Sequence, residues 1–271
     1  MMVYSRSHDL EKGEELMREF EAYNLKPDLS TYTNLMVLYK NGQQFHKAIE
    51  LYKKVHEDPE IEGDELFYSV FMRICAKVHR CEMAVKVWDH LTKSREKMTC
   101  LPINAYIKAL ASRKDYAERA IEVWRVEMNK GMQPDSDTYV GLLKACGMIG
   151  DVKTAFNAIQ DMKAADMPIT VYIYNGLLRT YASAVASESI LPSLRDLYVK
   201  DAWELFKNIS MHSPEMISSN LLDSLLLVHT NGHHIDKAEG LVLPLYETYK
   251  LPMTPWTFEF IVKLYSDTNQ L

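Results

Sequence analysis

Glycine and proline are scarce in this sequence, with ten of each among 271 residues. A β-sandwich or β-barrel needs a turn-forming residue about every 8–12 positions, and this chain does not supply them. Long helices joined by short polar turns need far fewer. The shortage therefore argues against the common all-β architectures and predicts an all-α protein.

Cysteine and long apolar runs are also scarce. The four cysteines, Cys75, Cys81, Cys100 and Cys146, are scattered and form no CxxC pair, which argues against a disulfide framework and favours a reducing compartment. The most apolar run, near residues 221–228, is far shorter than the roughly 18 residues of a membrane span. The first fifteen residues contain four acidic side chains and do not resemble a targeting peptide.

Positive charge is in deficit, because 31 lysines and arginines face 37 aspartates and glutamates and leave a net charge of −6. A protein of this sign does not attract phosphate backbones through its overall field. Any nucleic-acid binding has to be local. The balance of 47% hydrophobic and 25% charged residues is that of a globular chain with a core.

An internal repeat is the main feature that the sequence does have. A small residue is followed by apolar residues three, four and seven positions later, which is the spacing of one helix face. The pattern recurs at intervals of 35, 36, 36, 35, 47 and 36 residues, and only Glu127 interrupts its last place. The leading small residues are Gly13, Ala48, Ala84, Ala120, Ala155, Ala202 and Ala238.

Each helix marked by a small residue is preceded by another helix, so every unit is a helical hairpin. Tyr32, Leu35, Met36 and Tyr39 show the same helical spacing in one unit. A small residue at a fixed place indicates a close approach of two helices, and stacked hairpins of constant length predict an α-solenoid. Pro27-Asp28 and Pro134-Asp135 end units, where the aspartates are placed to cap the next helix.

Short motifs at the unit ends carry a family resemblance. Thr31-Tyr32-Thr33 opens one unit, and Asn24-Leu25-Lys26-Pro27-Asp28 and Gly131-Met132-Gln133-Pro134-Asp135 close two others. Here the chain resembles the pentatricopeptide repeat proteins, whose units begin near T-Y-N and end near G-x-x-P-D. The tetratricopeptide repeat is the nearest competitor, but it has a W…L-G…Y opening and no terminal P-D. The resemblance implies a right-handed superhelix of helix-turn-helix repeats.

Placed by this pattern, the repeats fill the chain as a single solenoid. Since it starts and stops inside repeats, and a terminal repeat normally needs a polar cap, we expect a fragment or the ordered part of a longer protein. The predicted units are a half repeat at 1–28, repeats at 29–64, 65–99, 100–135, 136–170, 171–218 and 219–254, and a half repeat at 255–271.

Two repeats are irregular. Repeat 171–218 holds about twelve extra residues within 183–198, where we expect a loop that either docks a protein partner or is a self-packed or disordered connector. Pro244 falls inside the second helix of repeat 219–254 and should kink or break it. The register of the first helix in that repeat is open between Asn220 and Asp223, and the downstream spacing favours Asp223.

The resemblance also implies a face that binds single-stranded RNA at about one base per repeat. One first-helix residue and the closing residue of the repeat form the implied base-selecting pair. Thr33 with Asp64 resembles a guanine-preferring pair, and Asn104 with Asp135 a uracil-preferring pair. The other pairs depart from the family pattern, and valine cannot bond a base edge. They are Ser69 with Thr99 and Val140 with Thr170, while the partner of Asn175 is obscured by the insertion.

A residue near the start of each repeat is implied to stack on bases. Leu66, Leu101, Tyr172 and Trp256 suit this role, whereas Ser30 and Asp137 do not. Base stacking on aromatic rings contributes about 1–3 kcal/mol per base. The alternative is that these side chains pack against the neighbouring repeat, as apolar residues at helical spacing commonly do.

Catalytic and metal-binding signals are weak. Cys75, His79 and Cys81 fit a helix face and a turn better than a metal site, and we expect His229, His233 and His234 to be solvated in an inter-helix turn. There is no Gly-rich phosphate loop, HExxH or G-x-S-x-G motif. We therefore expect no enzyme, metal or cofactor.

The resemblance implies an organellar single-stranded RNA-binding protein that acts on an mRNA or rRNA in RNA maturation, stability or translation. The implied compartment is the mitochondrial matrix, with the chloroplast second. The alternative is a protein-protein scaffold subunit of a large ribonucleoprotein such as the mitochondrial ribosome, with limited mRNA contact. The acidic net charge, the departing pairs and the insertion favour this alternative.

Overall fold

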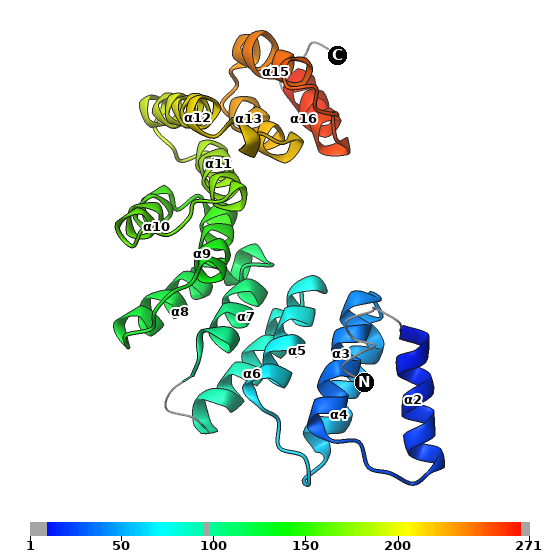
Figure 1. Ribbon diagram of the computed structural model, residues 1–271. Helices are drawn as coiled ribbons and strands as arrows, with labels where there is room; N and C mark the ends of the chain where they lie inside the picture. Colours follow the sequence, from blue (N-terminus) through cyan, green and yellow to red (C-terminus); the bar gives the residue numbers. More distant parts are fainter. Residues whose placement is uncertain (1–9, 95–97, 267–271) are drawn as a thin grey trace. The chain divides into compact units, whose positions relative to one another are not determined.

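The computed structural model describes residues 10–94 and 98–266, all of whose regular elements are helices (Figure 1). The prediction of an all-α solenoid is confirmed. The chain divides into two compact units, residues 1–133 and 134–271. Parts of the two predicted half repeats, residues 1–9 and 267–271, lie outside the described residues, as do residues 95–97.

Unit 1 is a row of helical hairpins. The first helix of each hairpin packs against the first helix of the next, α3 on α5 and α5 on α7, and the second helices pack on these. The first helices are α3 (Leu29–Asn41), α5 (Glu65–Lys77) and α7 (Cys100–Leu110), and the second helices are α2 (Leu10–Ala22), α4 (Phe45–Glu57), α6 (Cys81–Ser94) and α8 (Ala117–Asn129), the last preceded by the 3₁₀ turn η1 (Lys114–Tyr116).

Unit 2 repeats the arrangement, with first helices packed in the order α9, α11, α13 and α16. These helices are α9 (Ser136–Ile149), α11 (Val171–Val185), α13 (Ser219–Asn231) and α16 (Pro255–Ser266). The other elements are α10 (Val152–Ala164), α12 (Pro192–His212), η2 (Pro214–Met216), α14 (Ile235–Lys237), η3 (Ala238–Val242) and α15 (Leu243–Thr248).

Each first helix begins at the residue where a repeat is predicted to begin. In α3, α5 and α9 the preceding aspartate caps the helix. The side chains of Asp28, Asp64 and Asp135 accept hydrogen bonds from the backbone N–H three residues further on. At Asp135 the bond is reciprocal, because Thr138 Oγ1 accepts from the Asp135 N–H. Capping satisfies an amide that the helix itself leaves unpaired. The capping predicted for Asp28 and Asp135 is confirmed.

The small residues that set the repeat period are all buried at the helix contacts. Gly13 is buried, and the six alanines at the equivalent place have essentially no exposed surface. Glu127, which interrupts the apolar pattern, is also buried, and its carboxylate accepts a hydrogen bond from Lys130 Nζ at 2.8 Å. The ion pair lets a charged residue occupy a place that is apolar in the other repeats.

The extra residues of repeat 171–218 form a short connection at residues 186–191 and additional helix. Most of them lengthen α12, which has 21 residues where α10 has 13. Pro192 fits the first turn of a helix because its missing N–H is not needed there. The extension packs on its own unit, with the rings of Tyr198 and Tyr181 5.7 Å apart.

The predicted break at Pro244 is confirmed. The second helix of repeat 219–254 is divided into α14, the π-helical turn η3 and α15, with Pro244 at the start of α15. Proline cannot donate to the helix, and its ring would clash with the carbonyl four residues earlier. A π-turn directly before the proline absorbs this conflict.

Candidate nucleic-acid interface

The second residue of each first helix lies on a solvent-exposed face. Leu66 is 50% exposed, Tyr172 70% and Trp256 56%, and Leu101 is half-buried. The packing alternative would bury these side chains between repeats. Their exposure instead leaves flat or branched apolar groups accessible to a ligand in both units. Ser30 and Asp137, the weak members of the predicted series, are exposed at the same place.

The fifth residue of each first helix is the predicted base-selecting position, one turn further along the same face. In α3 and α5 it is a buried hydroxyl residue, Thr33 or Ser69. Thr33 Oγ1 donates to the backbone oxygen of Leu29 at 2.8 Å, and Ser69 Oγ donates to that of Glu65. A base that took a hydrogen bond from either hydroxyl would have to displace this local bond.

Two fifth-place residues are asparagines, which carry both a donor and an acceptor. Asn104 is buried in α7. Asn175 in α11 is half-buried, and its Oδ1 has no hydrogen-bond partner within the described residues. Since buried polar atoms are normally paired, the amide of Asn175 is suited to an incoming donor. Val140 holds the same place in α9 and offers none.

The aspartates that close repeats 29–64 and 100–135 cap the next helix. Asp64 Oδ1 accepts from the Phe67 N–H at 2.7 Å, and Asp135 Oδ1 accepts from the Thr138 N–H at 2.8 Å. A carboxylate has two oxygens and several lone pairs, so capping through Oδ1 does not use its whole acceptor capacity. Thr170 precedes α11 without a side-chain cap.

Thr99 is held by its own repeat. Its backbone N–H and its hydroxyl both donate to Oε2 of Glu65, the first residue of repeat 65–99. Because Ser69 in the same repeat also donates internally, both members of this predicted pair are occupied. The pair Ser69 and Thr99, which departs from the family pattern, is thus hydrogen-bonded within the protein.

Asp223 occupies the fifth place of α13, as the spacing predicts, but its carboxylate is buried in a polar cluster. Tyr246 Oη donates to Asp223 Oδ1 and Thr254 Oγ1 to Oδ2, each at 2.7 Å, and the Thr257 hydroxyl donates to Oδ1. Burial raises the pKa of Tyr246, so its phenol stays protonated and donates. The cluster joins α13, α15 and the start of α16. Sequence reasoning missed it, because its hydroxyls are distant in the chain and follow no motif.

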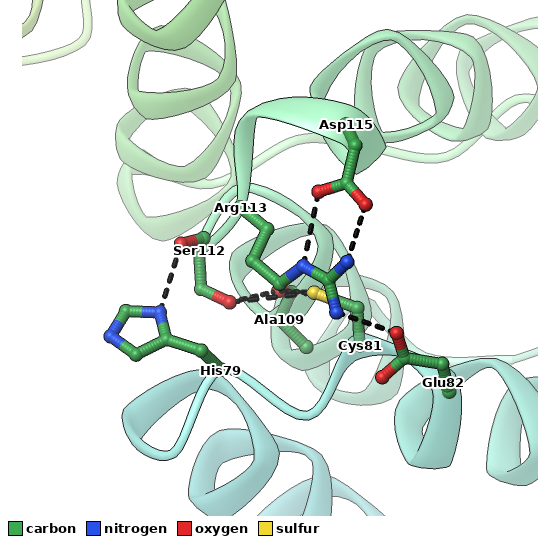
Figure 2. A network of polar contacts seen from close by, with 7 residues as sticks. All are labelled: His79, Cys81, Glu82, Ala109, Ser112, Arg113 and Asp115. Carbon is green, nitrogen blue, oxygen red and sulfur yellow. Dashed lines mark hydrogen bonds and ion pairs between the residues drawn. The ribbon is translucent and has the colours of Figure 1, made fainter.

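The sulfur and histidine side chains near residues 75–81 are structural. Figure 2 shows the contacts that the turn before α6 and the first residue of α6 make with the end of α7 and the residues just after it. Cys81 Sγ donates to the Ala109 oxygen at 3.2 Å, and His79 Nδ1 bonds the Ser112 oxygen at 2.9 Å. Burial raises the pKa of the Cys75 thiol to about 12. No group of three or more His, Cys, Asp or Glu residues in the described part could hold a metal ion.

The expectation that the three histidines near residue 230 are solvated is wrong for His229. His229 belongs to α13 and is 1% exposed, and its ring centroid lies 6.2 Å from that of Trp203. Only His233 is exposed in the turn, while half-buried His234 pairs with Asp196 at 3.0 Å. His229 belongs to the buried face at the end of α13 and not to the turn that follows this helix.

None of the described helices is both long and apolar enough to cross a membrane.

Two protein-family models match the chain. One, described as a pentatricopeptide repeat-containing protein, matches residues 66–197. The other, described as the pentacotripeptide-repeat region of PRORP, matches residues 1–111. The matches overlap and together extend over residues 1–197.

Similar curated proteins are longer than this chain. A mitochondrial pentatricopeptide repeat-containing protein of Arabidopsis thaliana is 20% identical over 210 residues, which cover 66% of this chain and 30% of that protein. The mitochondrial 15S rRNA processing factor CCM1 of Yarrowia lipolytica is 22% identical over 151 residues, 54% of this chain and 19% of that protein. The chain therefore spans about a third or less of these relatives.

Solved structures share the fold. The pentatricopeptide repeat protein PPR10 in complex with an 18-nucleotide psaJ RNA element is 16% identical, with a TM-score of 0.76 over 99% of this chain and 37% of that one. The repeat domain of Arabidopsis thaliana protein-only RNase P 1 with tRNA is 14% identical, with a TM-score of 0.51 over 72% of this chain and 95% of that one. With its repeat motifs, its stacked hairpins and these matches, the chain belongs to the pentatricopeptide repeat family.

Proposed function

We propose that this chain is a non-catalytic repeat segment that binds single-stranded RNA on its first-helix face. The observation that carries the proposal is the row of exposed apolar side chains at the second place of the first helices, above all Tyr172 and Trp256. Exposed aromatic rings suit unpaired bases, which stack on them independently of sequence. Asn104 and Asn175, each one turn along from the second place, supply amides that can select a base edge.

The expected context is RNA maturation, stability or translation on an mRNA or rRNA in mitochondria, with the matrix as compartment. Support for this finer assignment comes from similar proteins, several of which are named as mitochondrial and one as an rRNA processing factor. The chloroplast is the second proposed compartment.

The roles of individual residues follow from their surroundings. Thr33, Asp64, Ser69, Thr99, Leu101, Asn104, Asp135, Tyr172 and Asn175 are the candidate contacts. Among them, Tyr172, Leu101 and the two asparagines are the strongest, because Thr33, Ser69 and Thr99 already donate their hydroxyls within the protein. We propose base stacking as the main source of affinity, with base selection confined to few repeats.

The test is equilibrium binding of fluorescent single-stranded RNA to the purified chain and to Tyr172→Ala and Trp256→Ala variants. Losing one stacked base costs about 1–3 kcal/mol, and 1.4 kcal/mol is a factor of ten in affinity. Each variant should therefore bind about tenfold more weakly.

Phe156→Ala is the matched control, because Phe156 is an aromatic residue on the second helix α10 and is 50% exposed. This variant should bind RNA like the unchanged chain. Failure of the unchanged chain to bind RNA, or an equal loss in all three variants, would contradict the proposal.

A scaffold function within a large ribonucleoprotein is the second candidate. The observation in its favour is that Thr33, Ser69, Thr99 and Asp223 bond within the protein at places where base contacts are predicted. A scaffold of this kind should co-sediment with the assembly in cell extracts prepared in ribonuclease-free buffer. It should bind isolated RNA only weakly. Recovery as a free monomer would count against it.

A further inference from the structure

The second helices of unit 1 form a groove that the proposed function does not use. Helices α6 and α8 both pack on α7, and a groove of about 650 Å³ lies between them. Trp88 of α6 lines it, and its ring stacks on that of Tyr106 in α7 with centroids 4.5 Å apart. Val123 and Val126 of α8 add apolar surface, and Val126 is 43% exposed. None of the residues proposed above to contact RNA lines this groove.

Acidic side chains dominate the lining. Four carboxylates and two cations line the groove, namely Asp115, Glu118, Glu122 and Glu127 against Arg119 and Lys130. Two of the carboxylates are already neutralised. Arg113 binds Asp115 through two guanidinium nitrogens, as Figure 2 shows, and Lys130 binds Glu127 at 2.8 Å. The negative charge that remains belongs to the other two carboxylates.

Glu118 and Glu122 are exposed, and neither forms an ion pair with the residues that the structure describes. They are four residues apart on one face of α8, where like charges repel. Arg119, the neighbouring cation of the lining, lies 3.9 Å from Asp89 of α6. The helix dipole accounts for Glu118 in the first turn, but not for Glu122 one turn further on. A cation supplied from outside would relieve this repulsion.

A second groove of the same kind shows that the acidic surplus is not a general property of the repeats. It measures about 440 Å³ and lies between the second helices α2 and α4. Three carboxylates and three cations line it, namely Glu14, Glu21 and Glu50 against Arg18, Lys47 and Lys54. The charges of that groove cancel. The groove between α6 and α8 therefore has a preference for positive charge that its counterpart lacks.

We propose that the groove between α6 and α8 binds a basic amphipathic helix of a protein partner. Lysines or arginines on that helix pair with Glu118 and Glu122, and its apolar side packs on Val123, Val126 and Trp88. Recognition of a helix in a groove uses apolar anchors three and four residues apart. Helix α8 has 13 residues, about 20 Å, which offers a partner helix three to four turns of contact.

The chemistry of the lining argues against other ligands. Unpaired carboxylates repel a phosphate backbone, so the groove is unsuited to RNA. In the described part of the chain no group of three or more His, Cys, Asp or Glu residues could hold a metal ion. The inference goes beyond the proposed RNA binding and does not depend on it, because the two surfaces share no residue.

The test is fluorescence anisotropy of the purified chain with a labelled helical peptide of about 14 residues, with leucines on one face and lysines on the other. A second peptide has glutamate in place of every lysine and should not bind. Glu118→Gln with Glu122→Gln should weaken binding of the lysine peptide about tenfold, as expected for the loss of two ion pairs at the surface. Val126→Ser should weaken it about threefold through lost apolar contact.

Glu21→Gln with Glu50→Gln is the matched control, because it removes the same charge from exposed residues that line the groove between α2 and α4. This variant should bind the lysine peptide like the unchanged chain. Glu118→Asp with Glu122→Asp keeps the charge and should keep most of the affinity.

Four results would overturn the inference. One is failure of the lysine peptide to bind at up to about 1 mM. Another is an equal loss in the Gln variant and the control, which would assign binding to the net charge of −6. Displacement by spermine together with full binding by Val126→Ser would assign the groove to a small polyamine. Weaker binding of oligouridylate by the Gln variant would assign it to RNA.

Discussion

The buried imidazole of His229 makes the stability of unit 2 depend on pH. Neither of its ring nitrogens has a hydrogen-bond partner within the described residues. Burial, followed by the nearby His234 and Lys237, lowers its pKa from the ordinary value of 6.5 to about 4. The folded protein therefore keeps this ring neutral at pH values where the unfolded chain protonates it.

The sign and size of the effect follow from proton linkage. Between pH 6.5 and about 4 the unfolded state binds one more proton than the folded state, so the free energy of unfolding falls as the pH falls. One pKa unit corresponds to about 1.4 kcal/mol. The shift therefore removes about 2.5 kcal/mol between pH 7.5 and pH 4.5 and about 3.5 kcal/mol in total.

The perturbation is His229→Phe, which keeps a ring beside Trp203 and removes the titrating nitrogens. Urea unfolding of the chain and the variant, followed by tryptophan fluorescence at pH 7.5 and 4.5, measures the difference. The variant should be more stable at pH 7.5 by about 1 kcal/mol, because two unpaired buried atoms are gone. Its advantage should grow by about 2.5 kcal/mol at pH 4.5.

His212→Phe is the control, since His212 is exposed near the end of α12. It should leave the pH dependence of the unchanged chain intact. A His229→Phe variant whose stability falls with pH in parallel with the unchanged chain would refute the burial and neutrality of this ring.

Substitutions at three further positions test the packing and one helix cap. Gly150→Ala should lower the free energy of unfolding by about 2 kcal/mol or more, measured by urea titration, because the residue has φ +75° and a Cβ would lie 2.7 Å from the Ala184 nitrogen. Asp223→Ala leaves the buried Tyr246 hydroxyl without its acceptor and should cost about 2–4 kcal/mol in the same assay, with Asp223→Asn costing less. Asp64→Ala removes a helix cap and should lower the free energy of unfolding by about 1 kcal/mol, measured by thermal unfolding. An unchanged midpoint would show that the cap does not stabilise the chain.

The repeat architecture could be predicted from sequence because its causes are local and periodic. A small residue every 35 or 36 positions marks a helix contact, and an aspartate after proline marks a cap. Both features recur in several repeats, so the prediction does not depend on a chance match in any one repeat. The break at Pro244 was also predictable, since it depends only on the chemistry of proline.

The parts that could not be predicted depend on contacts between distant residues. Asp223 binds hydroxyls that lie between 23 and 34 residues further on. Whether Thr33 and Ser69 point to a ligand or to their own helix is decided by rotamers that periodicity does not report. The extension of α12 was missed because an insertion in a repeat usually forms a loop.

The most direct test of RNA binding on the first helices is photo-crosslinking with a single-stranded RNA that carries 4-thiouridine, followed by mass spectrometry of the linked peptides. We expect the bases to stack on the exposed rings of Tyr172 in α11 and Trp256 in α16. The crosslinks should therefore map to first helices and include these two residues. Crosslinks confined to the second helices, such as the α10 segment around Phe156, would contradict the account.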